Sequence, residues 1–87
     1  MEIEIFTKRN CHLCEVMIKT VRECLNELNN DSELKVTDIE SGKDLLKYKL
    51  KIPVLMVGKK MFAKYSVDKD ILKKKLISIS WQESNLR

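Results

Sequence analysis

Near its N-terminus the chain changes from a strand-like pattern to a helix-like pattern, and two cysteines mark the change. Residues 2–6 alternate polar and apolar side chains and include two isoleucines, which predicts a β-strand. The polar segment 7–10 follows as a loop, with Asn10 as the expected N-cap of a helix. Beyond this point apolar side chains recur at helical spacing, at Met17, Ile18, Val21, Leu25 and Leu28. Cys11-His12-Leu13-Cys14 therefore opens an amphipathic helix directly after a strand.

The next segments predict a second strand and a shorter second helix. Residues 34–39 alternate in polarity, which predicts a strand. Ser41 is followed three residues later by Asp44, a pattern that resembles a capping box and predicts a helix near 42–48. Strands joined through a helix run parallel, so we expect the first two strands to be parallel.

The C-terminal half predicts a β-hairpin and a last helix. The continuous apolar run 54–57 suits a strand covered on both faces. Gly58-Lys59-Lys60 then connects it to an antiparallel return strand over 61–65. Asp68 and Asp70 lie in the first turn of the last helix, where acidic side chains suit the helix dipole. This helix carries Ile71, Leu72, Leu76 and Ile79.

These elements predict an α/β fold with the order βαβαββα, which is a four-stranded mixed sheet with three helices. The 87 residues form one domain, 1–87, with a core over about 2–79 and a C-terminal tail over 80–87 that lacks a clear pattern. A chain of this length buries roughly 60–65% of the surface that its unfolded form exposes, so its core is thin.

The composition narrows the classes of partner and compartment. The formal net charge is +4 and the excess is lysine, but both signs are interspersed and no basic–aromatic motif appears, so we expect no nucleic acid partner. The first residues show no secretory pattern, and no segment approaches the ~20 apolar residues of a membrane span. We therefore expect a cytoplasmic protein with no membrane association. Two nearby cysteines in such a protein indicate redox or metal chemistry.

The two cysteines of the motif differ in their expected surroundings. Cys11 would lie in the first turn of the helix, where backbone N–H groups favour a thiolate, and Lys8, Arg9 and His12 add positive charge nearby. Cys14 belongs to the apolar stripe and is expected to face the core. We therefore predict that Cys11 is the nucleophile and Cys14 the resolving thiol of a disulfide exchange. His12 is expected to tune the local charge and to contact the substrate.

The third cysteine, Cys24, lies ten residues beyond Cys14 on the same predicted helix. That separation is about 15 Å along the axis, whereas a disulfide needs Cα atoms within roughly 7 Å. Cys24 is therefore expected to be a small buried residue.

The order of elements, the motif Cys11-His12-Leu13-Cys14 and the segment 48–55 together resemble glutaredoxin-like proteins of the thioredoxin superfamily, over about residues 2–79. The resemblance implies a thioredoxin-like fold, a protein disulfide oxidoreductase activity of Cys11 and Cys14, and a cis peptide bond at Pro53. It also implies that the main chain at Ile52 pairs with an extended substrate, and that Lys8 contacts glutathione.

Three departures from the family pattern bear on the substrate. No proline stands between the cysteines, and Asn10 replaces the tryptophan that precedes the thioredoxin motif. The stretch Phe62–Ser66 lacks the glycine pair that admits glutathione in glutaredoxins. We therefore expect protein disulfides as substrates, with glutathione as a potential co-substrate and no other cofactor.

The partners expected from this interpretation are substrate proteins and either an upstream reductase or glutathione, with the chain acting as a monomer. Metal binding is the main competing function. Cys11, His12 and Cys14 could supply part of a zinc site or of an iron–sulfur cluster shared between two chains, although zinc takes four ligands and no second Cys/His cluster exists. The sequence is also compatible with a glutathione-dependent glutaredoxin and with a non-catalytic adaptor.

Overall fold

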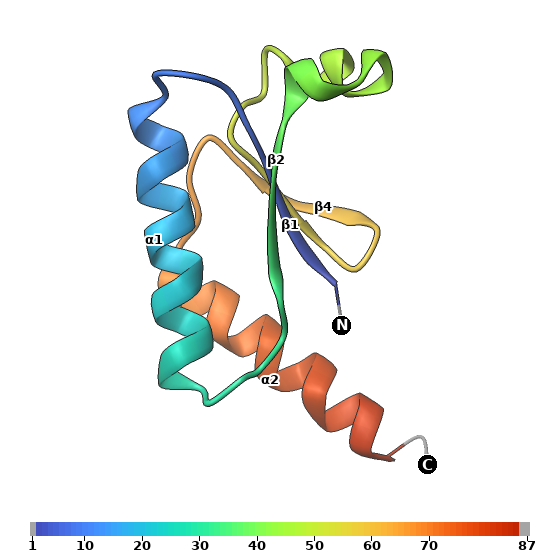
Figure 1. Ribbon diagram of the computed structural model, residues 1–87. Coiled ribbons are helices and arrows are strands. Elements are labelled where there is room, and N and C mark those ends of the chain that lie inside the picture. Colours follow the sequence, from blue (N-terminus) through green and yellow to red (C-terminus); the bar gives the residue numbers. More distant parts are fainter. Residues whose placement is uncertain (1, 86–87) are drawn as a thin grey trace.

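The N-terminal strand lies inside the sheet. In the computed structural model, which describes residues 2–85, β1 (Ile3–Thr7) pairs in parallel with β2 (Leu34–Asp38) and antiparallel with β3 (Val54–Val57). β4 (Lys60–Lys64) pairs antiparallel with β3, so the strand order is β2-β1-β3-β4. The predicted four-stranded mixed sheet is confirmed (Figure 1).

Two α-helices cover one face of this sheet. α1 (His12–Glu27) and α2 (Lys69–Asn85) contribute their apolar stripes to one buried cluster with the side chains of β1 and β3. That cluster contains Ile3, Ile5, Met17, Val21, Cys24, Leu25, Leu55, Val57, Leu72 and Leu76. Because such side chains are closely packed, truncating Leu76 to alanine is expected to lower the free energy of unfolding by about 2–5 kcal/mol.

Among the described helices, none is both long and apolar enough to cross a bilayer.

The second predicted helix, near 42–48, is wrong in type, because residues 39–48 form two short 3₁₀ segments, η1 (Ile39–Ser41) and η2 (Lys43–Tyr48). The Asp38 carboxylate accepts from the Glu40 N–H at 2.8 Å and the Ser41 hydroxyl donates to the Asp38 carbonyl at 2.6 Å, so Ser41 closes η1. Gly42 then lies in extended backbone and caps η2 without a side-chain hydrogen bond. Short, weakly capped turns of this kind favour 3₁₀ geometry.

The last helix is longer than its sequence pattern predicts. Its first turn is capped by Asp68, whose carboxylate accepts from the Ile71 N–H at 3.0 Å, and the helix continues through 80–85 of the predicted tail. Residues 86–87 of that tail lie outside the described residues.

Ion pairs join the two α-helices at the surface. Lys69 of α2 contacts Glu23 at 3.4 Å and Glu27 at 2.8 Å, and Lys73 contacts Glu27 at 3.0 Å. Hydrogen bonds from Lys69 and Lys73 lower the pKa of Glu27, and the bond to Glu27 raises the pKa of Lys69. These side chains are exposed or partly exposed, so the pairs are screened by salt.

We predict that Glu27→Gln lowers the melting temperature slightly at neutral pH and low salt. Because the folded-state pKa of Glu27 is lowered, its stabilisation is present above the ordinary glutamate pKa and is lost as the pH falls through the folded value. The raised pKa of Lys69 means that the same stabilisation is also lost as the pH rises through the folded lysine value. The difference from the parent protein should therefore shrink at either extreme and at 1 M salt. Glu33→Gln, an exposed carboxylate with no ion pair among the described residues, is the matched control. An equal loss in both variants would contradict the assignment.

Candidate active site

Cys11 itself forms the N-cap of α1. Its backbone is extended, with φ −112° and ψ 101°, and its Sγ accepts a hydrogen bond from the Cys14 N–H at 3.1 Å. Its carbonyl accepts from the Glu15 N–H at 3.2 Å. The prediction that Asn10 caps this helix is wrong, because Asn10 has φ 53° and lies one residue before the cap. The sulfur of Cys11 thus takes the place that a hydroxyl or carboxylate takes at other helix starts.

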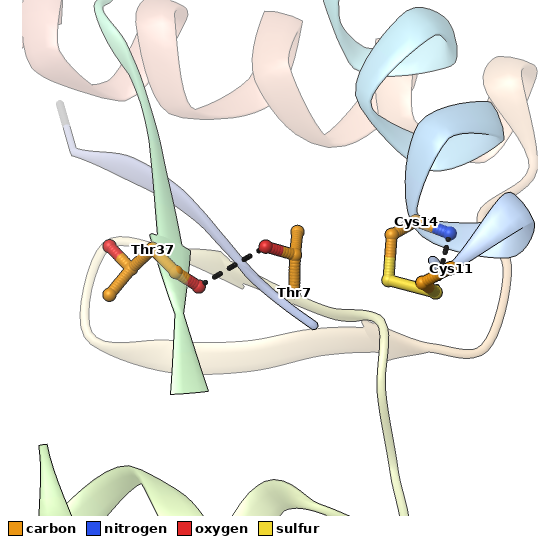
Figure 2. Close-up of a disulfide and its surroundings, with 4 residues drawn as sticks. All are labelled: Thr7, Cys11, Cys14 and Thr37. Carbon is orange, nitrogen blue, oxygen red and sulfur yellow. Dashed lines mark hydrogen bonds between the residues drawn. A yellow bond between two sulfur atoms is a disulfide. The ribbon is translucent and has the colours of Figure 1, made fainter. Parts of the chain in front are cut away.

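Cys11 and Cys14 are joined by a disulfide, with their Cα atoms 5.2 Å apart. Figure 2 shows the bridge at the first turn of α1, beside the end of β1, where the Thr7 hydroxyl donates to the Thr37 carbonyl at 3.5 Å. The two sulfurs differ in access, since Cys14 is 2% exposed and Cys11 is only partly buried. The expectation that Cys14 faces the core is confirmed.

Behind the disulfide lies a second apolar cluster, separate from the one under the helices. Cys14 packs with Phe6, Ile39, Ile52 and Val54, and the partly buried Cys11, Tyr48 and Met56 pack against them. The Tyr48 ring stacks on Phe6 with centroids 4.7 Å apart. The sequence analysis assigned no role in the site to Phe6, Ile39 or Tyr48. Phe6 could have been found from the sequence, because it is an aromatic residue close to the motif and lies on the face of β1 opposite the two isoleucines. The sequence carries no comparable signal for Ile39 or Tyr48.

The Ile52–Pro53 segment lies beside the disulfide. Its peptide bond is cis, as the resemblance implies, and both side chains are buried. The Pro53 carbonyl accepts from the Tyr65 N–H at 2.7 Å. Ile52 belongs to the same cluster as Cys14, so the fold brings together Cys11, Cys14 and Ile52, with Pro53 adjoining them.

The predicted basic groups make no hydrogen bond to the two sulfurs among the described residues. Lys8, Arg9 and His12 are exposed, and within residues 2–85 no hydrogen bond or ion pair joins Lys8 or His12 to either cysteine. Their positions next to the motif allow them to favour negative charge at Cys11 from a distance or to contact a bound substrate.

Cys24 is confirmed as a buried residue, and it belongs to the cluster under the helices. Its thiol donates to the Lys69 carbonyl at 3.6 Å. Burial raises the pKa of the Cys24 thiol, against a smaller opposite effect of the Lys69 and Lys73 charges. A neutral, inaccessible thiol of this kind is unreactive.

In the part of the chain that the structure describes, no three His, Cys, Asp or Glu side chains are grouped so that they could hold a metal ion. A zinc or iron–sulfur site at Cys11 and Cys14 would therefore need ligands from another molecule.

A family model for the glutaredoxin-like domain (DUF836) matches residues 2–77, which is nearly the whole of the described chain. The chain belongs to this family. No curated protein matches the sequence.

Solved structures share the fold of this glutaredoxin-like domain at low sequence identity. A structural-genomics target protein from X. campestris has a TM-score of 0.62 and 20% identity, over 87% of this chain and 96% of its own. Thioredoxin 1 from Thermosipho africanus has a TM-score of 0.58 and 19% identity, over 98% and 99%. The germline-specific thioredoxin Deadhead from Drosophila melanogaster has a TM-score of 0.56 and 18% identity, over 88% and 78%. The thioredoxin-like fold is thus established.

We predict a fixed order of alkylation when the reduced domain is treated with iodoacetamide at neutral pH. Cys11 should react first, because it is accessible and its sulfur accepts an N–H at a helix terminus. Cys14 should react more slowly, and Cys24 only after unfolding, because both are buried. Mass spectrometry of peptides locates the modification, and protein unfolded in guanidinium, in which all three thiols are accessible, is the control. Faster modification of Cys14 than of Cys11 would reverse their roles.

Proposed function

We propose that this glutaredoxin-like domain is a thiol–disulfide oxidoreductase that acts on protein disulfides. The observation that carries the proposal is the bridge between an accessible sulfur at the N-terminus of α1 and a buried sulfur one turn later. An exposed thiol beside unpaired helix N–H groups is nucleophilic, whereas a buried thiol stays protonated until it is needed.

In the reducing direction the thiolate of Cys11 attacks one sulfur of a substrate disulfide. The substrate S–S bond breaks, a mixed disulfide with Cys11 forms, and the displaced substrate thiolate takes up a proton. Cys14 then loses its proton and attacks the Cys11 sulfur, which releases the second substrate thiol and forms the Cys11–Cys14 disulfide. Two electrons pass to the substrate, and a dithiol reductase or two molecules of glutathione would restore the reduced pair. Because one chain supplies both sulfurs, exchange needs no second copy.

The main chain at Ile52 offers a place for an extended substrate segment. Ile52 lies outside the strands, and within residues 2–85 neither its N–H nor its carbonyl takes part in a backbone hydrogen bond. The residue lies next to the disulfide. An extended peptide can pair with such a free edge as an added strand. Pro53 has no N–H, so pairing would stop there.

The experiment that tests this proposal is the reduction of insulin disulfides with dithiothreitol as the thiol donor. The parent protein should accelerate reduction, and Cys11→Ser should lose the acceleration, because no nucleophile remains. Cys14→Ser should accumulate a mixed disulfide with the substrate, visible by non-reducing electrophoresis, because no thiol resolves it. Cys24→Ala, which changes a thiol outside the site, is the matched control and should keep most of the activity. A fully active Cys11→Ser variant would overturn the proposal.

We also predict that the mixed disulfide of glutathione and 2-mercaptoethanol is a poor substrate. The stretch Phe62–Ser66 lacks the glycine pair that admits glutathione in glutaredoxins. Tyr65 of this stretch lies beside Leu50 and Pro53, where its side chain should narrow the space that glutathione needs. Turnover is measured with glutathione reductase and NADPH as the coupled system. A rate comparable to that of a typical glutaredoxin would assign the domain a glutathione-dependent activity instead.

A further inference from the structure

Tyr65 connects two parts of the chain beside the disulfide. It follows β4 directly, its N–H donates to the Pro53 carbonyl at 2.7 Å, and its hydroxyl donates to the Leu50 carbonyl at 2.9 Å. Tyr65 therefore forms hydrogen bonds with both ends of the segment 50–53. The hydroxyl bond links positions that are 15 residues apart in the sequence.

The backbone of Tyr65 is in an unusual conformation. Its φ is 69°, in the left-handed region, where bulky side chains are rarely found. The turn at Gly58 adopts almost the same φ, 66°, with a glycine, which has no Cβ to clash. Strained conformations persist where the surroundings determine them, and they cluster at functional sites.

The segment 50–53 has an exposed end at Leu50 and Lys51 and a buried end at Ile52 and Pro53. The side chain of Leu50 is 85% exposed and Lys51 is exposed, whereas the Ile52 side chain packs with Cys14. The Lys51 N–H donates to the Tyr48 carbonyl at 2.8 Å. The hydrogen bonds from Tyr65 thus flank the Ile52 main chain on both sides, at the Leu50 carbonyl of the exposed end and at the Pro53 carbonyl of the buried end.

We propose that Tyr65 is a positioning residue, which holds the main chain at Ile52 in register with the disulfide so that an extended segment of a substrate protein can pair with it. This role rests on the proposed oxidoreductase function. Chemical attack by Cys11 does not involve Tyr65. Loss of the hydroxyl should therefore weaken the binding of protein substrates without slowing the reaction of Cys11 with a small reagent.

The test compares Tyr65→Phe and Tyr65→Gly with the parent protein. In Tyr65→Phe we expect the KM for insulin to rise about twofold to tenfold, the fold-change that corresponds to one net hydrogen bond, with kcat unchanged. The rate at which the reduced protein reacts with 5,5′-dithiobis(2-nitrobenzoate) should stay at the parent value. Tyr65→Gly adopts the left-handed conformation without strain but lacks the hydroxyl, so its KM should rise at least as much. Ser41→Ala, which removes another exposed hydroxyl-to-carbonyl bond outside the segment 50–53, is the control and should behave as the parent.

A parent KM in either Tyr65 variant would overturn the proposal, as would an equal loss of rate toward insulin and the small reagent, which indicates a general structural defect. Amide hydrogen exchange gives a readout that does not depend on activity. The Lys51 amide should exchange faster in Tyr65→Phe, because the segment is held less firmly, and unchanged exchange would also overturn the proposal. If the parent protein itself fails to reduce insulin, the proposed function fails, and the exchange measurement still decides whether Tyr65 positions the segment.

Discussion

The burial of the apolar stripe of α1 against the inner strand β1 is the interaction on which the rest of this structure depends. Ile3 and Ile5 point toward the helices and meet Met17 and Val21 in one cluster. Because β1 has neighbours on both sides, its position is fixed by two ladders of hydrogen bonds. The loop that leaves β1 is short, so the first turn of α1 has little freedom. The motif at that turn is held in place by a core that it does not itself form.

The two apolar clusters contain different cysteines: the larger one lies under the helices and the smaller one lies behind the disulfide. Cys24 belongs to the larger cluster under the helices, where burial keeps its thiol neutral. Cys14 belongs to the smaller cluster with Phe6 and Ile52, at the edge of which Cys11 is accessible. Three cysteines on one helix, or at its cap, therefore have three different environments. Among the described residues, the Cys11 sulfur is the one that accepts a hydrogen bond from a backbone N–H.

The four strands, both α-helices and the position of the cysteine pair could be predicted from the sequence, because they follow from periodicity and motif spacing within short segments. The family was indicated by the resemblance of the motif and of residues 48–55 to glutaredoxin-like proteins. The helix type predicted near 42–48 was wrong, since the hydrogen bonds of Asp38 and Ser41 make a tight turn before Gly42 instead of a capping box. The predicted N-cap of α1 was wrong by one residue, because a cysteine sulfur acts as the acceptor.

The residues that surround the disulfide follow from tertiary packing and not from a local sequence pattern. The stacking of Phe6 on Tyr48 and the bonds from Tyr65 to Leu50 and Pro53 join segments that are far apart in the chain. Periodicity reports the face on which a side chain lies, but it carries no information about which distant segment packs on that face. Such contacts arise only when sheet register and helix packing bring the segments together, and for that reason the surroundings of the cysteines could not be derived from the sequence.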